Sequence, residues 1–221
     1  MNDNSYPGRE ILSKLNCTKI DVLCIGKQPL INLIEEDRCG GYWKPLDQSI
    51  LEKKHNFYFF DNLNSVELIK HLKKNNYSLG IQGGTGILKK NIINLFKFGI
   101  INFHPGDLPF YRGCSAPEYQ YLDNKEIICT AHFINSKIDC GNIIEKKKLN
   151  VSYLSYNKFR ASIYPEISFF VNDLINRLLI DKSVIENTIV QNEQEAIYRN
   201  YIGDKVILRL KENFLNINRP D

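Results

Sequence analysis

The sequence predicts an α/β protein built on a mostly parallel sheet with helices on both faces. Short β-rich runs alternate with amphipathic stretches over the first two-thirds of the 221 residues. The order strand, helix, strand, helix is typical of such a sheet. The length suits one sizeable hydrophobic core with a small appendage. We expect a core over residues 1–152, and a C-terminal helix and tail over residues 153–221 that serve dimerisation or substrate binding.

Local patterns place the individual elements. Four strands of the parallel sheet are expected at β-rich, apolar runs, namely residues 20–26, 57–60, 77–82 and 100–104. A helix is expected over residues 66–76, where Ser65 and Glu67 offer helix-start chemistry, and another over residues 89–99, closing on Gly99. A strand pair is expected at residues 127–134 and 143–152, on either side of the turn DCGN. A long helix is expected over residues 157–180, and an irregular or weakly β tail over residues 195–207.

Composition narrows the class of protein. The net charge is only +4, from 29 basic and 25 acidic residues, and the lysines come in short runs typical of solvated surface. The six cysteines form no C-x-x-C pair, which favours buried thiols over a zinc or disulfide framework. No apolar run approaches membrane-spanning length, and the first ten residues carry no signal-peptide core. We therefore expect a cytoplasmic protein that binds neither nucleic acid, membrane nor metal.

The stretch INFHPGDLPFYRG, residues 101–113, is the most informative. Asn102 and His104 are two apart on an expected strand, so both side chains leave the same face. Pro105 cannot donate to a β-ladder and ends the strand there. Ligands of parallel sheets bind beyond the carboxyl ends of the strands. The pair therefore indicates a binding site, although a capped strand end with a surface histidine is an equally good interpretation of this fragment alone.

A carboxylate completes a possible catalytic set. Asp139 lies in the expected turn NSKIDCGNII, 35 residues after His104. An amide, an imidazole and a carboxylate can together perform acyl transfer. The amide donates a hydrogen bond to the developing oxyanion, and the imidazole shares a proton near neutral pH. The carboxylate orients the imidazole and assists the attacking amine.

These motifs resemble those of the tetrahydrofolate-dependent formyltransferases. INFHPGDLPFYRG is similar to the family's N-x-H-P signature, and CTAHFINSKIDCGNII to its second motif. The resemblance implies the Rossmann-like formyltransferase fold, N10-formyltetrahydrofolate as co-substrate, no metal, and catalytic roles for Asn102, His104 and Asp139. It also implies that folate is contacted by two segments, at Gly84, Thr85, Gly86, Ile87, Leu88, Ser136 and Ile138.

The resemblance alone indicates the acceptor, which is the amine that receives the formyl group. The chain looks most like the sugar N-formyltransferases, which implies a homodimer acting on a nucleotide-linked amino-dideoxy sugar such as dTDP-4-amino-4,6-dideoxyglucose, for lipopolysaccharide O-antigen. Glycinamide ribonucleotide or another amine is the alternative acceptor, although no Gly-Ser-Asn phosphate loop occurs. The roughly 70 residues after the core leave little room for the tRNA-binding domain of methionyl-tRNA formyltransferases. A catalytically silent binding or assembly subunit is a further alternative.

Three further features of the sequence lead to expectations: the start of the chain, His132 and Arg112. The resemblance implies a central first strand ahead of the helix expected at GREILSKLN, yet only MNDNSYP precedes that helix. A sheet without that strand would expose its neighbours' edges. His132, two residues after Thr130 on an expected strand, is interpreted as a structural histidine. Arg112 is expected to meet either a phosphate or solvent.

Overall fold

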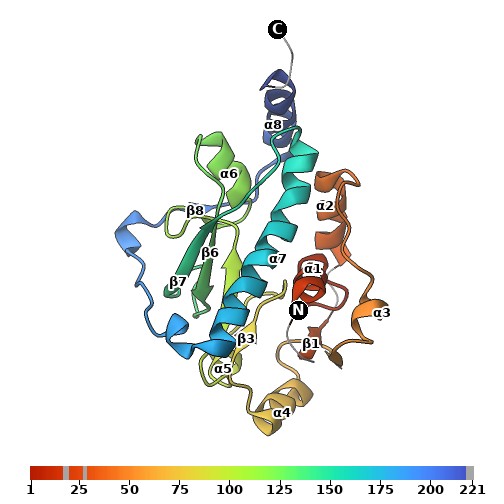
Figure 1. Ribbon diagram of the computed structural model, residues 1–221, viewed down its shortest axis with the longest axis vertical. Coiled ribbons are helices and arrows are strands. Elements are labelled where there is room, and N and C mark those ends of the chain that lie inside the picture. The colour runs from red at the N-terminus through yellow and green to blue at the C-terminus, as the bar shows by residue number, and fades with distance from the viewer. Residues whose placement is uncertain (17–19, 27–28, 218–221) are drawn as a thin grey trace.

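The described residues form three sheets, two of them parallel and one mixed. The computed structural model describes residues 1–16, 20–26 and 29–217 (Figure 1). The central sheet has the order β3-β4-β6-β7, with β3 and β4 parallel and the other neighbours antiparallel, while β1 and β2 pair in parallel, as do β5 and β8. The strands are β1 (Asp21–Ile25), β2 (Asn56–Phe60), β3 (Gly80–Ile81), β4 (Ile100–His104), β5 (Arg112–Gly113), β6 (Ile128–Phe133), β7 (Ile143–Lys148) and β8 (Tyr198–Arg199).

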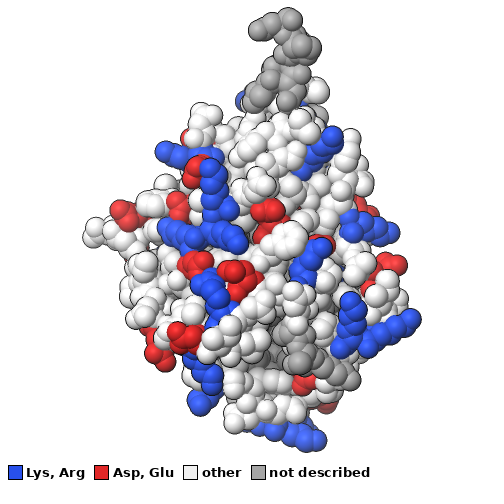
Figure 2. Space-filling view, in the orientation of Figure 1, with Lys and Arg blue, Asp and Glu red and all other residues white. Residues whose placement is uncertain are grey.

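Helices cover both faces of these strands. The long α7 crosses the front of the central sheet, with α1 and α2 beside it (Figure 1). The helices are α1 (Tyr6–Lys14), α2 (Pro29–Cys39), α3 (Gln48–Leu51), α4 (Val66–Asn75), α5 (Lys90–Ile93), α6 (Ala116–Leu122), α7 (Tyr156–Ile180) and α8 (Asp204–Ile217). On the face seen in Figure 2, basic and acidic side chains are interspersed rather than gathered in one basic track.

Strand β4 shows how the chain fills both layers. Ile101 and Phe103 point into a cluster with α7, where Phe103 meets the ring of Phe170 edge to face at 5.3 Å. Ile100 points the other way, into the cluster formed by α4 and α5. The α/β fold class with helices on both faces is therefore confirmed. Ile101 and Phe103 thus make one face of β4 apolar, while on the other face Ile100 is followed by the polar Asn102 and His104.

The start of the chain lies between β1 and β3. Met1 and Asp3 hydrogen-bond the end of β1, and the amide of Asn2 donates to the carbonyl of Gly84 beyond β3. Helix α1 then passes so close to this loop that a Cβ on Gly8 would lie 2.6 Å from the Gly83 carbonyl oxygen. The Ser5 hydroxyl caps α1 and donates to the same carbonyl at 2.9 Å.

The largest departures from expectation lie in the tail, in the third strand and in the helix expected over residues 89–99, which is reduced to α5 (Lys90–Ile93). Residues 195–207 were expected to be irregular or weakly β, and they contain β8 followed by the first turn of α8. Ile207, Leu210 and Phe214 recur at helical spacing and are buried, which explains the helix. The strand expected over residues 77–82 is reduced to Gly80–Ile81. Among the described helices, none combines the length and apolarity needed to cross a bilayer.

Candidate active site

Four polar side chains share one face of the β4–β6 pair. In the antiparallel register Asn102 lies opposite His132, and His104 opposite Thr130. Residues two apart on a strand leave the same face, so both members of each pair point away from the α7 core. The Thr130 hydroxyl donates to the Gly106 carbonyl at 2.6 Å and accepts from the amide of Leu108 at 3.2 Å. Thr130 therefore fixes the loop that leaves β4, while Asn102, His104 and His132 remain available for chemistry.

Asp139 faces both histidines from the loop between β6 and β7. Its Oδ2 lies 3.5 Å from His104 Nδ1, and its Oδ1 lies 3.6 Å from His132 Nε2. The same Oδ2 accepts a hydrogen bond from the amide of Gly113 at 2.9 Å. Asp139 adopts a left-handed backbone conformation with φ 52°, which non-glycine residues adopt rarely and often at functional sites. The loop thus holds a mostly buried carboxylate against two imidazoles.

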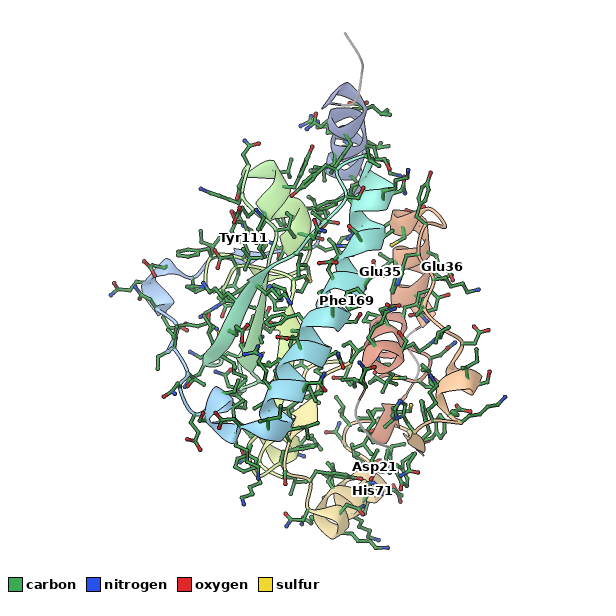
Figure 3. All side chains as sticks on the ribbon, in the orientation of Figure 1. Asp21, Glu35, Glu36, His71, Tyr111 and Phe169 are labelled. Atoms are coloured by element: carbon green, nitrogen blue, oxygen red, sulfur yellow. The ribbon has the colours of Figure 1, made fainter. Side chains whose placement is uncertain are left out.

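The hydrogen bonds of His104 define its tautomer. Its Nε2 lies 2.6 Å from the carbonyl oxygen of Tyr111, which can only accept, so Nε2 carries the proton. Tyr111 lies beside α6 (Figure 3). In the neutral ring Nδ1 is then the acceptor, turned toward Asp139. A proton taken up at Nδ1 would be held against the carboxylate, which is the arrangement that a proton-sharing imidazole requires.

His132 fixes the orientation of the Asn102 amide. His132 Nδ1 donates to the Phe133 carbonyl at 2.9 Å, so its Nε2 must accept. The atom 3.2 Å from that Nε2 is Asn102 Nδ2, the amide nitrogen. Burial and the neighbouring charge of His104 lower the pKa of His132 to about 4. His132 is therefore neutral at physiological pH, and it turns the donor end of Asn102 toward the site.

A cavity of about 210 Å³ opens directly onto these groups. Its walls come from the loop after β3, the polar face of β4 and β6, and the loop that carries Asp139. Gln82 braces the first wall, since its Nε2 donates to Thr85 Oγ1 at 2.9 Å and to the Gly86 carbonyl at 3.3 Å. The lining residues are Gln82, Thr85, Gly86, Ile87, Leu88, Asn102, His132, Ile134, Asn135, Lys137, Ile138 and Asp139.

Gln191, in the segment after α7, holds the Asp139 loop in place through hydrogen bonds. Gln191 Nε2 donates to the carbonyls of Asp139 and Gly141, at 2.9 and 2.7 Å. Gln191 Oε1 accepts from Arg112 Nη2 at 2.8 Å, and Arg112 also pairs with Glu193. Arg112 is fully buried, so the expectation that it meets a phosphate or solvent is wrong. Its charge is satisfied by a segment about 80 residues away in sequence.

The structure brings together most of the predicted site residues. Asn102, His104 and Asp139 converge, and of the expected folate-contacting residues Thr85, Gly86, Ile87, Leu88 and Ile138 line the cavity. Two others lie outside the lining: Ser136, and Gly84, whose carbonyl accepts from the amide of Asn2.

Five lining residues were not predicted for the site: Gln82, His132, Ile134, Asn135 and Lys137. The i, i+2 spacing of Thr130 and His132 on an expected strand was the available signal for His132. In the part of the chain that the structure describes, no group of three or more His, Cys, Asp or Glu side chains could hold a metal ion.

The surrounding sequence matches one protein family. Residues 51–158, which contain every lining residue of the cavity, match the family model described as formyl transferase. The chain carries a formyl transferase domain. The family recognised from the two motifs is thereby confirmed. Asn102, His104 and Asp139 all lie inside the matched range.

Curated relatives and solved structures agree with this domain. The chain is 28% identical over 138 residues to a methionyl-tRNA formyltransferase of Finegoldia magna, covering 61% of this chain and 44% of that protein. It is 26% identical over 166 residues to the methionyl-tRNA formyltransferase of Staphylococcus aureus, covering 72% of this chain and 50% of that protein. The chain thus spans about half the length of these curated relatives.

Solved structures with the same fold act on different acceptors. A methionyl-tRNA formyltransferase from Clostridium thermocellum superposes with a TM-score of 0.51 at 20% identity, covering 86% of this chain and 75% of that one. A 4-N formyltransferase from Francisella tularensis superposes with a TM-score of 0.51 at 18% identity, covering 82% of this chain and 76% of that one. A phosphoribosylglycinamide formyltransferase from Streptococcus pneumoniae superposes with a TM-score of 0.53 at 17% identity, covering 74% of this chain and 99% of that one. At these identities the likeness shows the fold of the formyltransferase domain.

Proposed function

We propose that this protein transfers a formyl group from N10-formyltetrahydrofolate to a primary amine. The observation that carries the proposal is the cluster of Asn102, His104 and Asp139: Asn102 and Asp139 line the cavity beside β4 and β6, and His104 Nδ1 lies 3.5 Å from Asp139 Oδ2. An oriented amide donor, an imidazole and a carboxylate meet there at one edge of a formyltransferase domain. Acyl transfer needs these three capacities together.

The chemistry follows from the positions of these groups. The lone pair of the acceptor amine attacks the formyl carbon, and the carbonyl π electrons move onto oxygen to give a tetrahedral oxyanion. The Asn102 amide donates a hydrogen bond to that oxyanion, and the proton held at His104 Nδ1 against Asp139 stabilises its negative charge. The attacking nitrogen loses a proton, directly or through water, to Asp139. The C–N10 bond then breaks, N10 gains a proton, and the products are a formamide and tetrahydrofolate.

The cavity suits one end of the folate. A volume of about 210 Å³ is below the range of whole drug-sized ligand sites, so it would take the pterin and formyl end while the remainder lies outside. Leu88 and Ile134 offer apolar walls for a flat ring, and the backbone of Thr85 and Gly86 offers hydrogen-bonding groups. Lys137, at the rim, could meet a carboxylate of the folate tail.

We propose a nucleotide-linked amino sugar as the acceptor. Tyr198 stands beside the catalytic loop, since its hydroxyl lies 2.8 Å from Cys140 Sγ, and its side chain is exposed. An exposed aromatic ring next to the reacting groups can stack a nucleotide base.

Initiator methionyl-tRNA is the second candidate acceptor. The curated relatives named above are methionyl-tRNA formyltransferases, and they match this chain over 138 and 166 residues. The two candidates demand different surfaces, because a tRNA contributes a long phosphate backbone and a nucleotide sugar only a diphosphate.

An acceptor panel tests the proposal. The protein is incubated with N10-formyltetrahydrofolate and, separately, with nucleotide-linked amino sugars, glycinamide ribonucleotide, methionyl-tRNA or no acceptor. Mass spectrometry then records a gain of one formyl group on the acceptor. We expect formylation of an amino sugar. Formylation of methionyl-tRNA alone would replace the acceptor and keep the reaction, whereas no formylation of any acceptor by folded protein would contradict the reaction itself.

A further inference from the structure

Strand β2 has an open outer edge in the part of the chain that the structure describes. It pairs there only with β1, in parallel and in unbroken one-to-one register. The Asn56 amide donates to the Ile20 carbonyl at one end, and the Gly26 amide donates to the Phe60 carbonyl at the other. Alternate residues of β2 therefore bond β1, and the backbone groups of the residues between them point away from it.

Phe57 and Phe59 carry these outward groups. Among the described residues, neither backbone N–H nor C=O of these two has a hydrogen-bond partner. Such an edge is a template for pairing with another strand, and proteins usually blunt it with Pro, charged side chains or a bulge. The sequence of β2, NFYFF, contains no Pro and no charge, and its register has no bulge. The β2 edge is therefore able to accept a further strand.

The rings of Phe57 and Phe59 lie on one face of this edge. Their centroids are 6.3 Å apart. Phe57 packs against the buried cluster that contains Leu12 of α1 and Leu51 of α3, whereas Phe59 is 57% exposed. Aromatic pairs across neighbouring strands stabilise a sheet, so the exposed ring offers contact area to an added strand.

The charges that flank β2 differ between its two ends. The exposed Lys53 and Lys54 precede the strand, and the exposed Asp61 follows it directly. Glu52, on the lysine side, accepts a hydrogen bond from Gln48 of its own chain at 3.0 Å. If two β2 strands pair antiparallel, the lysines of each copy lie beside Asp61 of the other, whereas a parallel pair would bring like charges together. The flanking charges therefore favour an antiparallel strand of the same sequence.

We propose that the β2 edge is the docking surface for a second copy of this chain, bound by antiparallel pairing of the two β2 strands about a two-fold axis at Tyr58. In this register Phe57 lies opposite the partner's Phe59, and Phe59 opposite the partner's Phe57. Each of these pairs exchanges its outward N–H and C=O groups, which gives about four backbone hydrogen bonds. The two Tyr58 residues face each other between them. Because both copies use the same patch, the assembly closes at two chains.

The proposed surface lies away from the candidate active site. In Figure 1 β1, the neighbour of β2, lies to the right of α7, whereas β6 and β7 lie to its left. The strand that carries His132 therefore takes no part in the pairing, and each copy keeps its own site. A contact made by one short strand falls at the small end of specific interfaces, so we expect a dissociation constant of about 1–100 µM.

Sedimentation velocity of the full chain between about 1 and 200 µM tests the proposal at low salt. Phe59→Pro removes an outward N–H and leaves the ladder with β1 intact, because that amide points away from β1. Asp61→Lys places like charges at both ends of the paired strands. Leu179→Lys, at an exposed apolar residue of α7, is the matched control. Circular dichroism establishes that each variant is folded.

We expect reversible dimers of the unmodified protein and of Leu179→Lys. Phe59→Pro should weaken dimerisation at least about tenfold, and Asp61→Lys about fivefold. Monomers at every concentration would overturn the proposal. Dimerisation that neither folded variant weakens would overturn it as well, and loss of dimers in Leu179→Lys alone would place the interface on α7. If Phe59→Pro does not fold, Asp61→Lys and a cross-link at Tyr58 decide.

The cross-link tests the register itself. In the proposed pair the two Cα atoms of residue 58 lie about 4.5 Å apart, within the range that a disulfide spans. Mild oxidation should therefore join Tyr58→Cys into a covalent dimer. Phe59→Cys faces residue 57 of the partner and should give much less, and the unmodified protein measures the background from its native cysteines. Equal yields from Tyr58→Cys and Phe59→Cys would contradict the two-fold axis at Tyr58.

Discussion

The amide nitrogen of Asn102 lies 3.2 Å from Nε2 of His132, across the antiparallel pair β4–β6. Because His132 Nδ1 is committed to the Phe133 carbonyl, this contact turns the amide donor of Asn102 toward the cavity. Oxyanion stabilisation depends on donors that are oriented before the reaction begins. His132 thus acts on the reaction through Asn102.

Replacing the ring nitrogen of His132 should therefore impair turnover. His132→Phe keeps a ring but removes the acceptor, and we expect kcat to fall about 10-fold to 100-fold as the Asn102 amide loses its orientation. His132→Gln can place an acceptor oxygen near the position of Nε2 and should retain more activity. Steady-state kinetics with both variants checks this order. Equal rates for His132→Phe and the unmodified protein would exclude the positioning role.

Gln191 should support catalysis from outside the cavity. Gln191→Leu leaves the carbonyls of Asp139 and Gly141 without their donor and removes the acceptor of Arg112. We expect a loss of about 1–3 kcal/mol in unfolding free energy and about a tenfold lower kcat as the Asp139 loop shifts. The exposed Gln194, three residues on, provides the matched control Gln194→Leu. The account of this loop fails if the two leucine variants behave alike in denaturant unfolding and kinetics.

Stability should increase with pH between 6 and 8 because of the Met1 ammonium. Its pKa is 8.0 in the unfolded chain and about 6 when buried, so in this window the unfolded state binds more protons. The free energy of unfolding then rises with pH by up to about 2.7 kcal/mol across the window and levels off above pH 8. Urea unfolding at pH 6, 7 and 8 measures it. N-terminal acetylation should remove this rise, and an identical slope in acetylated protein would assign it to other groups.

The contact between α1 and the loop after β3 should tolerate no side chain at Gly8. A Cβ there would lie 2.6 Å from the backbone oxygen of Gly83, so Gly8→Ala must displace the helix or the loop. We expect a loss of about 1–3 kcal/mol and a fall in Tm. At Gly203, by contrast, a Cβ meets nothing within 4 Å, and Gly203→Ala should change stability by much less. Similar Tm values for both variants would contradict this packing.

Much of the fold follows from local sequence patterns. The expected strand at residues 100–104 matches β4, and the helix expected after Ser65 begins at Val66, with the Ser65 hydroxyl accepting from Leu68. These elements were predictable because apolar periodicity and capping act within a few residues. The strand expected at residues 77–82 forms only over Gly80–Ile81, and these two residues line a cavity of about 480 Å³ between β1 and β3.

The site was only partly predictable, because several of its contacts join residues that are far apart in the sequence. Asn102 and His104 share a face by strand geometry alone, so their pairing could be inferred. His132 joins them only through the register of β4 against β6, and Gln191 reaches the Asp139 loop from about 50 residues away. Such contacts depend on long-range pairing that no local pattern records. The burial of Arg112 depends in the same way on Gln191 and Glu193.

The central claim is that His104 and its neighbours carry formyl transfer. Its most direct test is the rate at which label moves from N10-formyltetrahydrofolate carrying a ¹³C-formyl group to the amine acceptor, in the unmodified protein and in His104→Asn of equal Tm. We predict transfer by the unmodified protein and a loss of at least about 10²-fold in the variant. Near-normal transfer by folded His104→Asn would contradict the account.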